Sequence, residues 1–169
     1  MKNLRRKVVL TFFVFSLAFE LIGQNQITNR EIQFINLNAL NLIGEYQFSF
    51  KLKRARDYDN FENLFESENT LIFNDIMPDN NLNDQVTILE YMDLFDKYYD
   101  EIIEVVDIKP YEVRPIQELN DKKGLVSIYA KKIVFGPTKK EVNYKDTFDI
   151  EISIKYNLTN SSFKIASIK

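Results

Sequence analysis

The sequence predicts an α+β domain in which helices come first and long antiparallel strands come last. Apolar residues recur at helical spacing over residues 27–43 and again after Thr87. From residue 101 onward, apolar and polar residues alternate along several segments, which is typical of strands with one buried face. Hydrophobic residues make up 45% of the 169 residues and aromatic residues 14%, so the chain can bury a core.

The segment 1–23 has the pattern of a secretory signal. Basic side chains come first, the apolar stretch Val8 to Phe19 follows, and Gly23 supplies a small residue at the exit. A helix that spans a bilayer needs roughly 20 apolar residues, and Glu20 interrupts this stretch before that length. We therefore expect a signal peptide (1–23), a single mature domain (24–169) without a stable membrane span, and a periplasmic or secreted bacterial protein. Retention of the apolar stretch as an uncleaved anchor is the alternative.

Composition excludes several classes of function. The chain has 22 basic and 25 acidic residues, and removal of the basic first segment makes the mature domain more acidic still. Such a domain lacks the positive surface of a nucleic-acid-binding protein. The chain has no Cys and no His, which excludes disulfides, thiolate nucleophiles, His-dependent triads and the usual zinc sites. We expect no cofactor and no nucleic-acid partner.

Helical patterns occupy most of the first half of the mature domain. Residues 27–43 predict a helix that Gly44 ends. Residues 46–53 alternate apolar and polar, which predicts a short strand or an extended connector. Asp57 or Asp59 can cap a second helix, residues 58–65.

A short strand and a third helix follow. Residues 70–76 predict the strand, and Pro78 ends it. Thr87 and Glu90 form a capping box, which predicts the start of the helix. The apolar side of this helix carries Ile88, Tyr91, Met92, Phe95 and Tyr99.

The second half predicts strand after strand. Residues 102–108 form an apolar run bounded by Pro110, and residues 111–116 continue it past a kink. A long strand ends at Gly136 and Pro137, and the alternating segment 148–156 predicts a half-buried strand. Residues 157–162 predict a polar turn before the last strand. The apolar face of the long strand carries Val126, Ile128, Ala130 and Val134.

Three stretches resemble segments of the nuclear transport factor 2-like superfamily, which includes polyketide-cyclase-like and ketosteroid-isomerase-like proteins. FENLFESENTLIFNDIMP (61–78) resembles the helix-to-first-strand segment of that superfamily, VTILEYMDLFDKYY (86–99) its third helix, and TFDIEISIKYNLTNSSFKIASIK (147–169) its closing hairpin. The resemblance implies a cone-like fold, with N-terminal helices packed in a strongly curved, mostly antiparallel sheet. Members include enzymes and non-catalytic modules, so the fold does not choose a function. Many members form dimers through the sheet, which implies a possible homodimer here.

Asp75 is the acid that we consider as a catalytic base, because a base of this kind is a carboxylate in a cleft. Asn74 beside it and the hydroxyls of Tyr91 and Tyr129 are candidate ligand-binding groups. The alternative is that Asn74 and Asp75 only form the turn after the strand. The Asp-plus-His and Asp-plus-Tyr sites of the family enzymes do not map onto this chain.

We therefore expect a non-catalytic exported binding or interaction module. Its partner would be a small apolar ligand or a protein. The alternative is a small isomerase-type or cyclase-type enzyme that uses Asp75 as its base.

The polar loop before the third helix matches the oxygen positions of an EF-hand calcium loop. Two features argue against calcium. The sixth position holds Asp84 where the sharp turn requires Gly, and Glu90 already has a role in the capping box. We therefore expect no metal site, and we assign the loop to turn and cap chemistry. The candidate ligands are Asp79, Asn81, Asn83, Gln85, Thr87 and Glu90.

Overall fold

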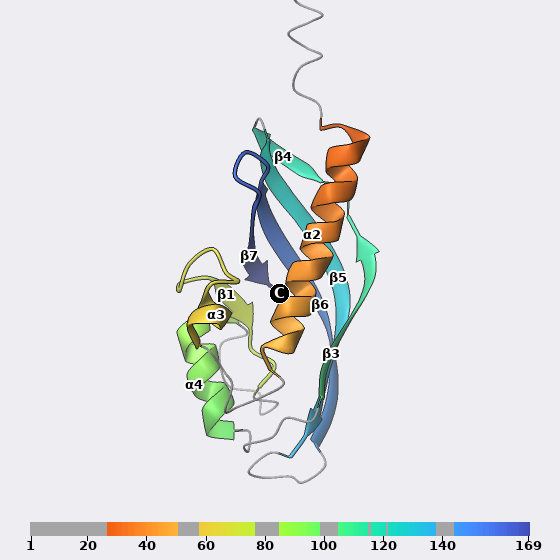
Figure 1. Cartoon of the computed structure of the whole chain (residues 1–169). Coiled ribbons are helices and arrows are strands. Elements are labelled where there is room, and N and C mark those ends of the chain that lie inside the picture. The colour runs from red at the N-terminus through yellow and green to blue at the C-terminus, as the bar shows by residue number, and fades with distance from the viewer. Residues whose placement is uncertain are drawn as a thin grey trace, which may run out of the picture. The chain divides into compact units, whose positions relative to one another are not determined.

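The computed structural model describes residues 27–50, 58–76, 85–98, 105–114, 116–120, 122–137 and 144–169 (Figure 1). The chain divides into two compact units, Met1–Ile32 and Gln33–Lys169, and the sheet lies in the second. The signal peptide expected over 1–23 lies outside the described residues. The helices are α2 (Asn29–Phe48), α3 (Tyr58–Glu62) and α4 (Ile88–Tyr98). The strands are β1 (Leu71–Phe73), β2 (Gln85–Thr87), β3 (Val105–Val113), β4 (Gln117–Asn120), β5 (Lys123–Gly136), β6 (Tyr144–Asn157) and β7 (Ser162–Ile168).

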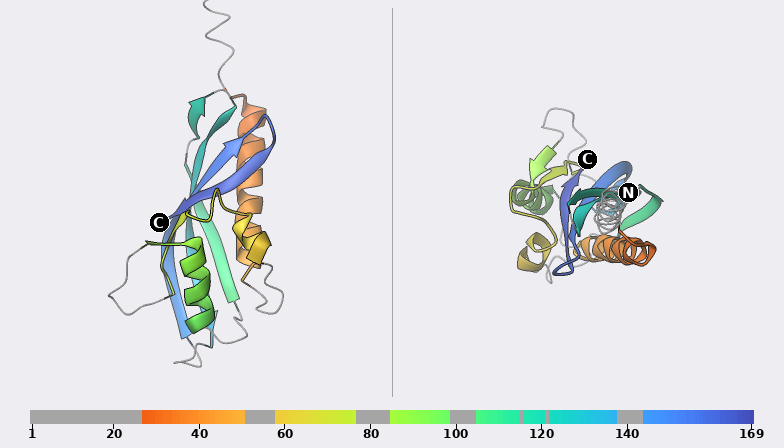
Figure 2. Two further views of the ribbon diagram at one scale, coloured as in Figure 1. Left: turned by 90° about the vertical axis from the view of Figure 1, so that its left-hand side faces the viewer. Right: turned by 90° about the horizontal axis from the view of Figure 1, so that it is seen from above.

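The strands form one sheet in the order β2-β1-β7-β6-β5-β3, and β4 pairs with the end of β5. Every pair is antiparallel except β1 and β7, which run parallel with Ile72 opposite Ile168. The sheet is curved and open rather than closed into a barrel (Figure 2). The predicted α+β class with a curved, mostly antiparallel sheet is therefore confirmed, with few helices.

The core lies against one face of the long strands. On β5, the predicted apolar residues at positions 126, 128, 130 and 134 are all buried, and so is Lys132 between them. On β6, Ile150, Ile152 and Ile154 are buried as the alternation predicted. Lys132 contacts side chains of α2 and α4 from this face, so both helices cover it. From Gln33 onward, α2 runs lengthwise along the sheet (Figures 1 and 2).

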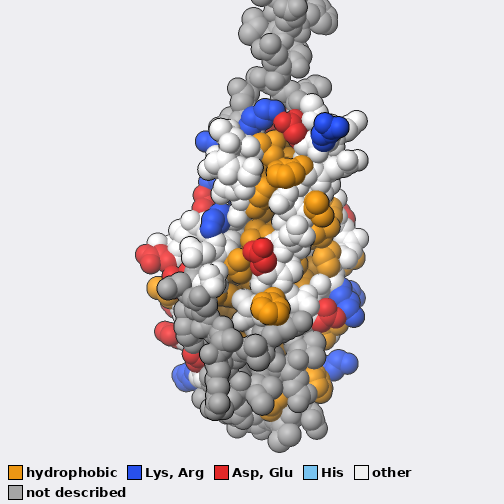
Figure 3. Space-filling model, viewed as in Figure 1, with side chains coloured by type: hydrophobic (Ala, Val, Ile, Leu, Met, Phe, Trp, Pro, Cys, Tyr) orange, Lys and Arg blue, Asp and Glu red, His pale blue; other side chains and the backbone are white. Residues whose placement is uncertain are grey.

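Helix α2 is longer than the sequence predicts. It continues through Gly44 to Phe48, so the predicted stop at Gly44 and the predicted strand or connector over 46–48 are wrong. The helix continues because Tyr46, completely buried, extends the inward stripe of Ile35, Ala39, Leu42 and Ile43 by one more turn. Burial of this aromatic ring outweighs the cost of a glycine in a helix, about 0.5–1 kcal/mol. Apolar side chains also gather on the outer surface over α2 (Figure 3).

Gly44→Ala should raise the free energy of unfolding by about 0.4–1 kcal/mol, because alanine favours the helix and restricts the unfolded chain. A Cβ atom at Gly44 would meet no other atom within 4 Å, so the methyl group costs no strain. Gly124→Ala is the matched opposite, since its Cβ would lie 2.4 Å from the carbonyl oxygen of Gln117 and 2.5 Å from the hydroxyl of Tyr156. Urea unfolding at low protein concentration measures both, and a loss of stability for Gly44→Ala would contradict the open helical position.

The short elements between α2 and α4 differ from the prediction in their bounds. Helix α3 ends at Glu62 instead of continuing to Phe65, and Phe65 forms a parallel bridge with Ile165. Strand β1 covers 71–73 only, because the chain turns at Asn74, whose Oδ1 accepts a hydrogen bond from the Ile76 amide. Strand β2, which the sequence did not predict, pairs antiparallel with β1. The predicted cap Asp57 lies outside the described residues.

Two elements follow the sequence signals closely. Thr87 and Glu90 form the predicted capping box, with the Glu90 amide donating to Thr87 Oγ1 at 3.3 Å and the Thr87 amide donating to Glu90 Oε2 at 2.8 Å. Between β6 and β7, the Thr159 amide donates to Asn157 Oδ1 at 3.0 Å, which makes the predicted polar turn. In β3, Pro110 does not end the strand but lies at a register shift.

Candidate functional site

The most unusual feature of the described core is an ion pair between Lys132 and Asp75. Lys132 Nζ lies 2.6 Å from Asp75 Oδ2, and the two side chains are 2% and 3% exposed. Nζ also donates to the hydroxyls of Tyr91 at 2.7 Å and of Tyr46 at 3.3 Å, and the Tyr91 hydroxyl donates to Asp75 Oδ1 at 2.7 Å. The ammonium group thus has one acceptor for each of its three protons. We call these four residues the buried cluster.

Each member of the buried cluster comes from a different element. Lys132 lies on the inward face of β5, and Tyr46 lies on the inward face of α2. Tyr91 follows the capping box in the first turn of α4. Asp75 lies in the turn after β1, where its amide donates to the Phe73 carbonyl at 3.2 Å. The cluster therefore joins both long helices and the sheet through polar contacts.

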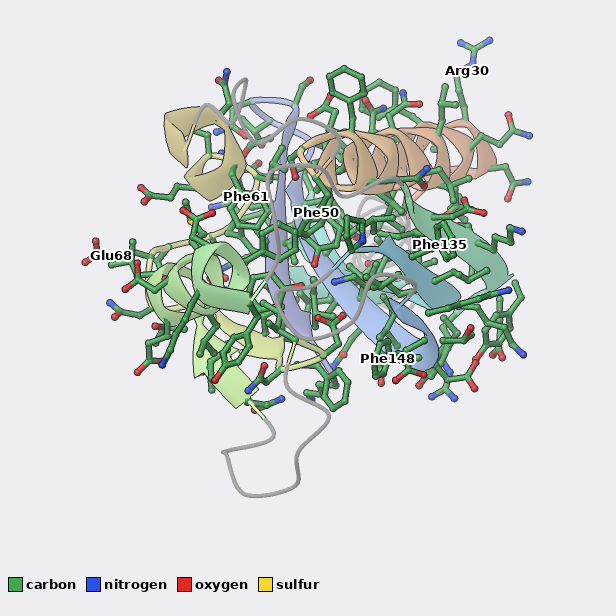
Figure 4. All side chains as sticks on the ribbon, turned by 90° about the horizontal axis from the view of Figure 1, so that it is seen from below. Arg30, Phe50, Phe61, Glu68, Phe135 and Phe148 are labelled. Carbon is green, nitrogen blue, oxygen red and sulfur yellow. The ribbon has the colours of Figure 1, made fainter. Side chains whose placement is uncertain are left out.

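Aromatic rings surround the ammonium group. Nζ lies 4.8 Å from the ring centroid of Phe50, 5.2 Å from that of Tyr91 and 5.5 Å from that of Tyr46. Such distances allow cation–π attraction. Phe50 in turn packs against Phe61, with ring centroids 5.7 Å apart, and both rings lie between the helices and the sheet (Figure 4). The ammonium group of Lys132 therefore occupies the space between these aromatic rings.

Burial and the neighbouring charges act in opposite directions on Lys132. Burial lowers the pKa of its ammonium group, but the negative charge of Asp75 and the contacts with Tyr46 raise the pKa, which ends above the usual 10.5. For Tyr46, burial raises the pKa above the usual 10.0, although the charge of Lys132 opposes this. At neutral pH, Lys132 is therefore charged and Tyr46 is neutral.

We expect the cluster to make the protein sensitive to alkali. Both groups hold their protons more tightly when folded than when unfolded, so stability is fully present below pH 10.0 and falls as pH rises through the raised pKa values. Urea unfolding at a series of pH values measures this loss. The variant Asp75→Asn/Lys132→Met lacks the lysine contribution, so its loss should be shallower. Equal losses in the variant and the parent would contradict the assignment to Lys132.

The structure brings two of the four candidate site residues together. Asp75 and Tyr91 are hydrogen-bonded to each other, whereas Asn74 serves the turn through its contact with the Ile76 amide. Tyr129 is on the opposite face of β5, so its proposed role as a hydroxyl donor beside Asp75 must be corrected. The reason is the two-residue period of a strand, since Tyr129 is an odd number of positions from Lys132. Its ring lies 4.3 Å from the Arg114 guanidinium carbon instead.

Sequence reasoning missed Lys132, Tyr46 and Phe50. The signal for Lys132 was present, because it shares the inward register of β5 with Ala130 and Val134. A lysine on an apolar face requires a buried acid to compensate its charge. Tyr46 and Phe50 were missed because the sequence predicts that the helix ends at Gly44, before both residues.

Among the candidate metal ligands, Glu90 is described and belongs to the helix cap. Its hydrogen bonds from the backbone and side chain of Thr87 lower the pKa of its carboxyl group. Asp79, Asn81 and Asn83 lie outside the described residues. In the described parts of the chain, no three acidic side chains are grouped so that they could hold a metal ion.

The buried cluster is chemically complete in itself. Both oxygens of Asp75 accept a hydrogen bond from the chain, and Asp75 is only 4% exposed. A general base must instead lie within hydrogen-bond reach of a substrate proton. The arrangement as it stands holds elements together and presents no reactive group to solvent.

None of the helices that the structure describes has the length and apolar character to cross a bilayer.

No known protein family and no curated protein matches this sequence. The solved structures that are similar to the chain include the following two. The association domain of C. elegans CaMKII is 12% identical over 82% of this chain and 93% of that domain, with a TM-score of 0.48. A proposed polyketide cyclase from Pseudomonas putida KT2440 is 14% identical over 76% of this chain and 86% of that protein, with a TM-score of 0.31.

Proposed function

We propose that this chain is a non-catalytic binding or interaction module of the nuclear transport factor 2-like type that works outside the bacterial cytoplasm. The observation that carries the proposal is the burial of Asp75 in the core, where Lys132 and Tyr91 bind its two oxygens. Helices on one face of a curved, mostly antiparallel sheet support the fold type. The order of basic, apolar and small residues over 2–23 supports export.

The chemistry of the remaining groups agrees with a module that does not catalyse. The chain has no His and no Cys, so acid–base and nucleophilic catalysis would have to use other groups. Lys132 cannot serve as an amine nucleophile near neutral pH, because its raised pKa keeps it protonated.

The outward face of the sheet favours a protein over a small apolar ligand as partner. Tyr111 is 56% exposed there, and its ring lies 6.5 Å from that of Tyr129, which carries Arg114 on its face. Tyr and Arg are enriched in protein interfaces, and Tyr111, Tyr129 and Arg114 lie together on this face. Pairing of two copies through the sheet would use this surface.

Reductive methylation with formaldehyde and a borohydride reductant tests the buried cluster. Lys131 and Lys132 are adjacent, but Lys131 is exposed and Lys132 is buried, so each lysine is the control for the other. In folded protein, mass spectrometry should find Lys131 methylated and Lys132 unmodified, and denaturant should remove the difference. If Lys132 reacted as fast as Lys131, small molecules would reach Asp75. That result would overturn the proposal in favour of an isomerase-type or cyclase-type enzyme with Asp75 as base.

We expect the mature protein to begin at or near Gln24, because the pattern over 2–23 is that of a cleavable signal. N-terminal sequencing of protein made in a secreting bacterium measures this. An intact Met1 on protein in the cytoplasm would refute export without affecting the buried cluster.

A further inference from the structure

Helix α2 has one apolar face that is buried in the core and a second, opposite face whose apolar side chains are largely exposed. The outer face carries Leu37, 60% exposed, and Phe48, 65% exposed, at its end. Phe34 and Leu40 lie beside Leu37, each about two-fifths exposed, and the ring of Phe34 also contacts that of Phe163 with centroids 5.9 Å apart. Positions 37, 40, 44 and 48 follow one another at intervals of three or four, so they form one stripe. Apolar side chains lie along α2 on the molecular surface (Figure 3). We call Phe34, Leu37, Leu40, Gly44 and Phe48 the outer stripe.

The outer face of α2 is also almost without charge. Glu45 is the one charged side chain between Gln33 and Phe48, although 28% of the whole chain is charged. A helix with one buried face normally carries charged residues on the other. Depletion of charge around aromatic and aliphatic side chains is instead typical of the centre of a protein interface. Two exposed amide side chains, Gln33 and Asn41, flank the stripe. Two other amides of the helix are engaged within the chain, since Asn38 donates to the Phe34 carbonyl and Gln47 accepts from the Ile108 amide.

We propose that the outer stripe is an interface with the same stripe of a second copy of this chain, related by a twofold axis. A twofold interface places a surface against itself, which an uncharged face does without repulsion. Amide side chains both donate and accept hydrogen bonds, so Gln33 and Asn41 can pair with their own copies. Gly44 lies in the stripe with open space around it, so a second helix can approach closely. A membrane surface fits less well, since a helix that lies on lipid is rich in Lys and Arg.

A contact made by one helix face of each copy predicts a reversible dimer. Exposed apolar patches of roughly 300–600 Å² are the largest on typical monomers and are often functional. Stable complexes bury about 800 Å² on each partner, so a single helix face supports a weaker pair, with dissociation in about the micromolar range. The proposal is independent of the buried cluster, because the outer stripe and the cluster use opposite faces of α2.

Sedimentation equilibrium over a range of concentrations tests the self-association. Leu37→Glu should weaken the dimer at least tenfold, because two copies would bury carboxylates against each other. Leu119→Glu is the matched control, since Leu119 is 53% exposed on β4, and it should dimerise like the parent. Unchanged thermal unfolding of the two variants at low concentration shows that they fold. A protein that is monomeric at every concentration, or a dimer that Leu37→Glu leaves intact, would overturn the proposal.

Disulfide crosslinking locates the interface, because the parent chain has no Cys. Asn41 lies midway between Phe34 and Phe48, so it is close to the twofold axis, and Asn41→Cys should form a covalent dimer under mild oxidation. Ser127→Cys on the outward face of β5 should not. The reverse result would place the contact on the sheet and overturn the use of α2. Neither result affects the methylation of Lys132, so this proposal and the proposed function fail separately.

Discussion

Lys132→Met should lower the free energy of unfolding by about 3–5 kcal/mol, because it leaves the carboxylate of Asp75 in the core without its counter-charge. The remaining contact from the Tyr91 hydroxyl compensates only one of the two oxygens. The loss should therefore exceed that of a simple change of shape. Equilibrium unfolding in urea measures it.

Two further variants separate charge from packing at Lys132. Asp75→Asn/Lys132→Met removes both charges and should recover most of the loss, since a buried pair contributes little net stability over neutral groups. Lys131→Met changes the exposed neighbour and should stay within about 0.5 kcal/mol of the parent. Similar losses for Lys131→Met and Lys132→Met would show that the ion pair is not buried.

Ile152→Ala should cost about 2–5 kcal/mol, the usual range for truncation of a buried aliphatic side chain. Ile152 is completely buried in β6, with Ile128 of β5 and Ile168 of β7 opposite it on the two neighbouring strands. The neighbouring strands limit how far the site can collapse around the cavity.

Ser153→Ala is the control for Ile152→Ala, because Ser153 is the next residue and points to the outward face. Its hydroxyl lies 3.4 Å from that of Ser127, so its loss removes at most one partly exposed hydrogen bond, about 0.5–1.5 kcal/mol. Urea unfolding compares the two variants. A loss below about 0.5 kcal/mol for Ile152→Ala would mean that the faces of β6 are assigned the wrong way round.

Features that depend on near neighbours were predictable. The capping box of Thr87 and Glu90 needs only residues three apart, and the structure contains it. The burial of Ile150, Ile152 and Ile154 follows from alternation alone. Gly44 shows the limit of this reasoning. Its local signal favours a helix end, but the burial of Tyr46 two residues later outweighs that preference.

Strand pairing over long separations was not predictable. Strand β2 consists of three residues, and its partner β1 ends at Phe73, well before β2 begins at Gln85. The parallel pairing of Ile72 with Ile168 joins opposite ends of the domain. The alternation of residues along a strand does not predict which other strand pairs with it. Pairing depends on which strand edges the rest of the fold leaves open.

The sequence by itself determined the class of the domain, the inward face of β5 and β6, and the absence of His and Cys chemistry, since each depends on composition or on a short repeat. It also determined that Lys132 shares the inward register of β5. Only the tertiary structure decided what Lys132 meets there. Tyr91 and Tyr46 are 41 and 86 residues away along the chain, and Asp75 is held by a separate turn. A buried charge is stable only where several distant groups meet around it, and helix and sheet packing alone brings these groups together.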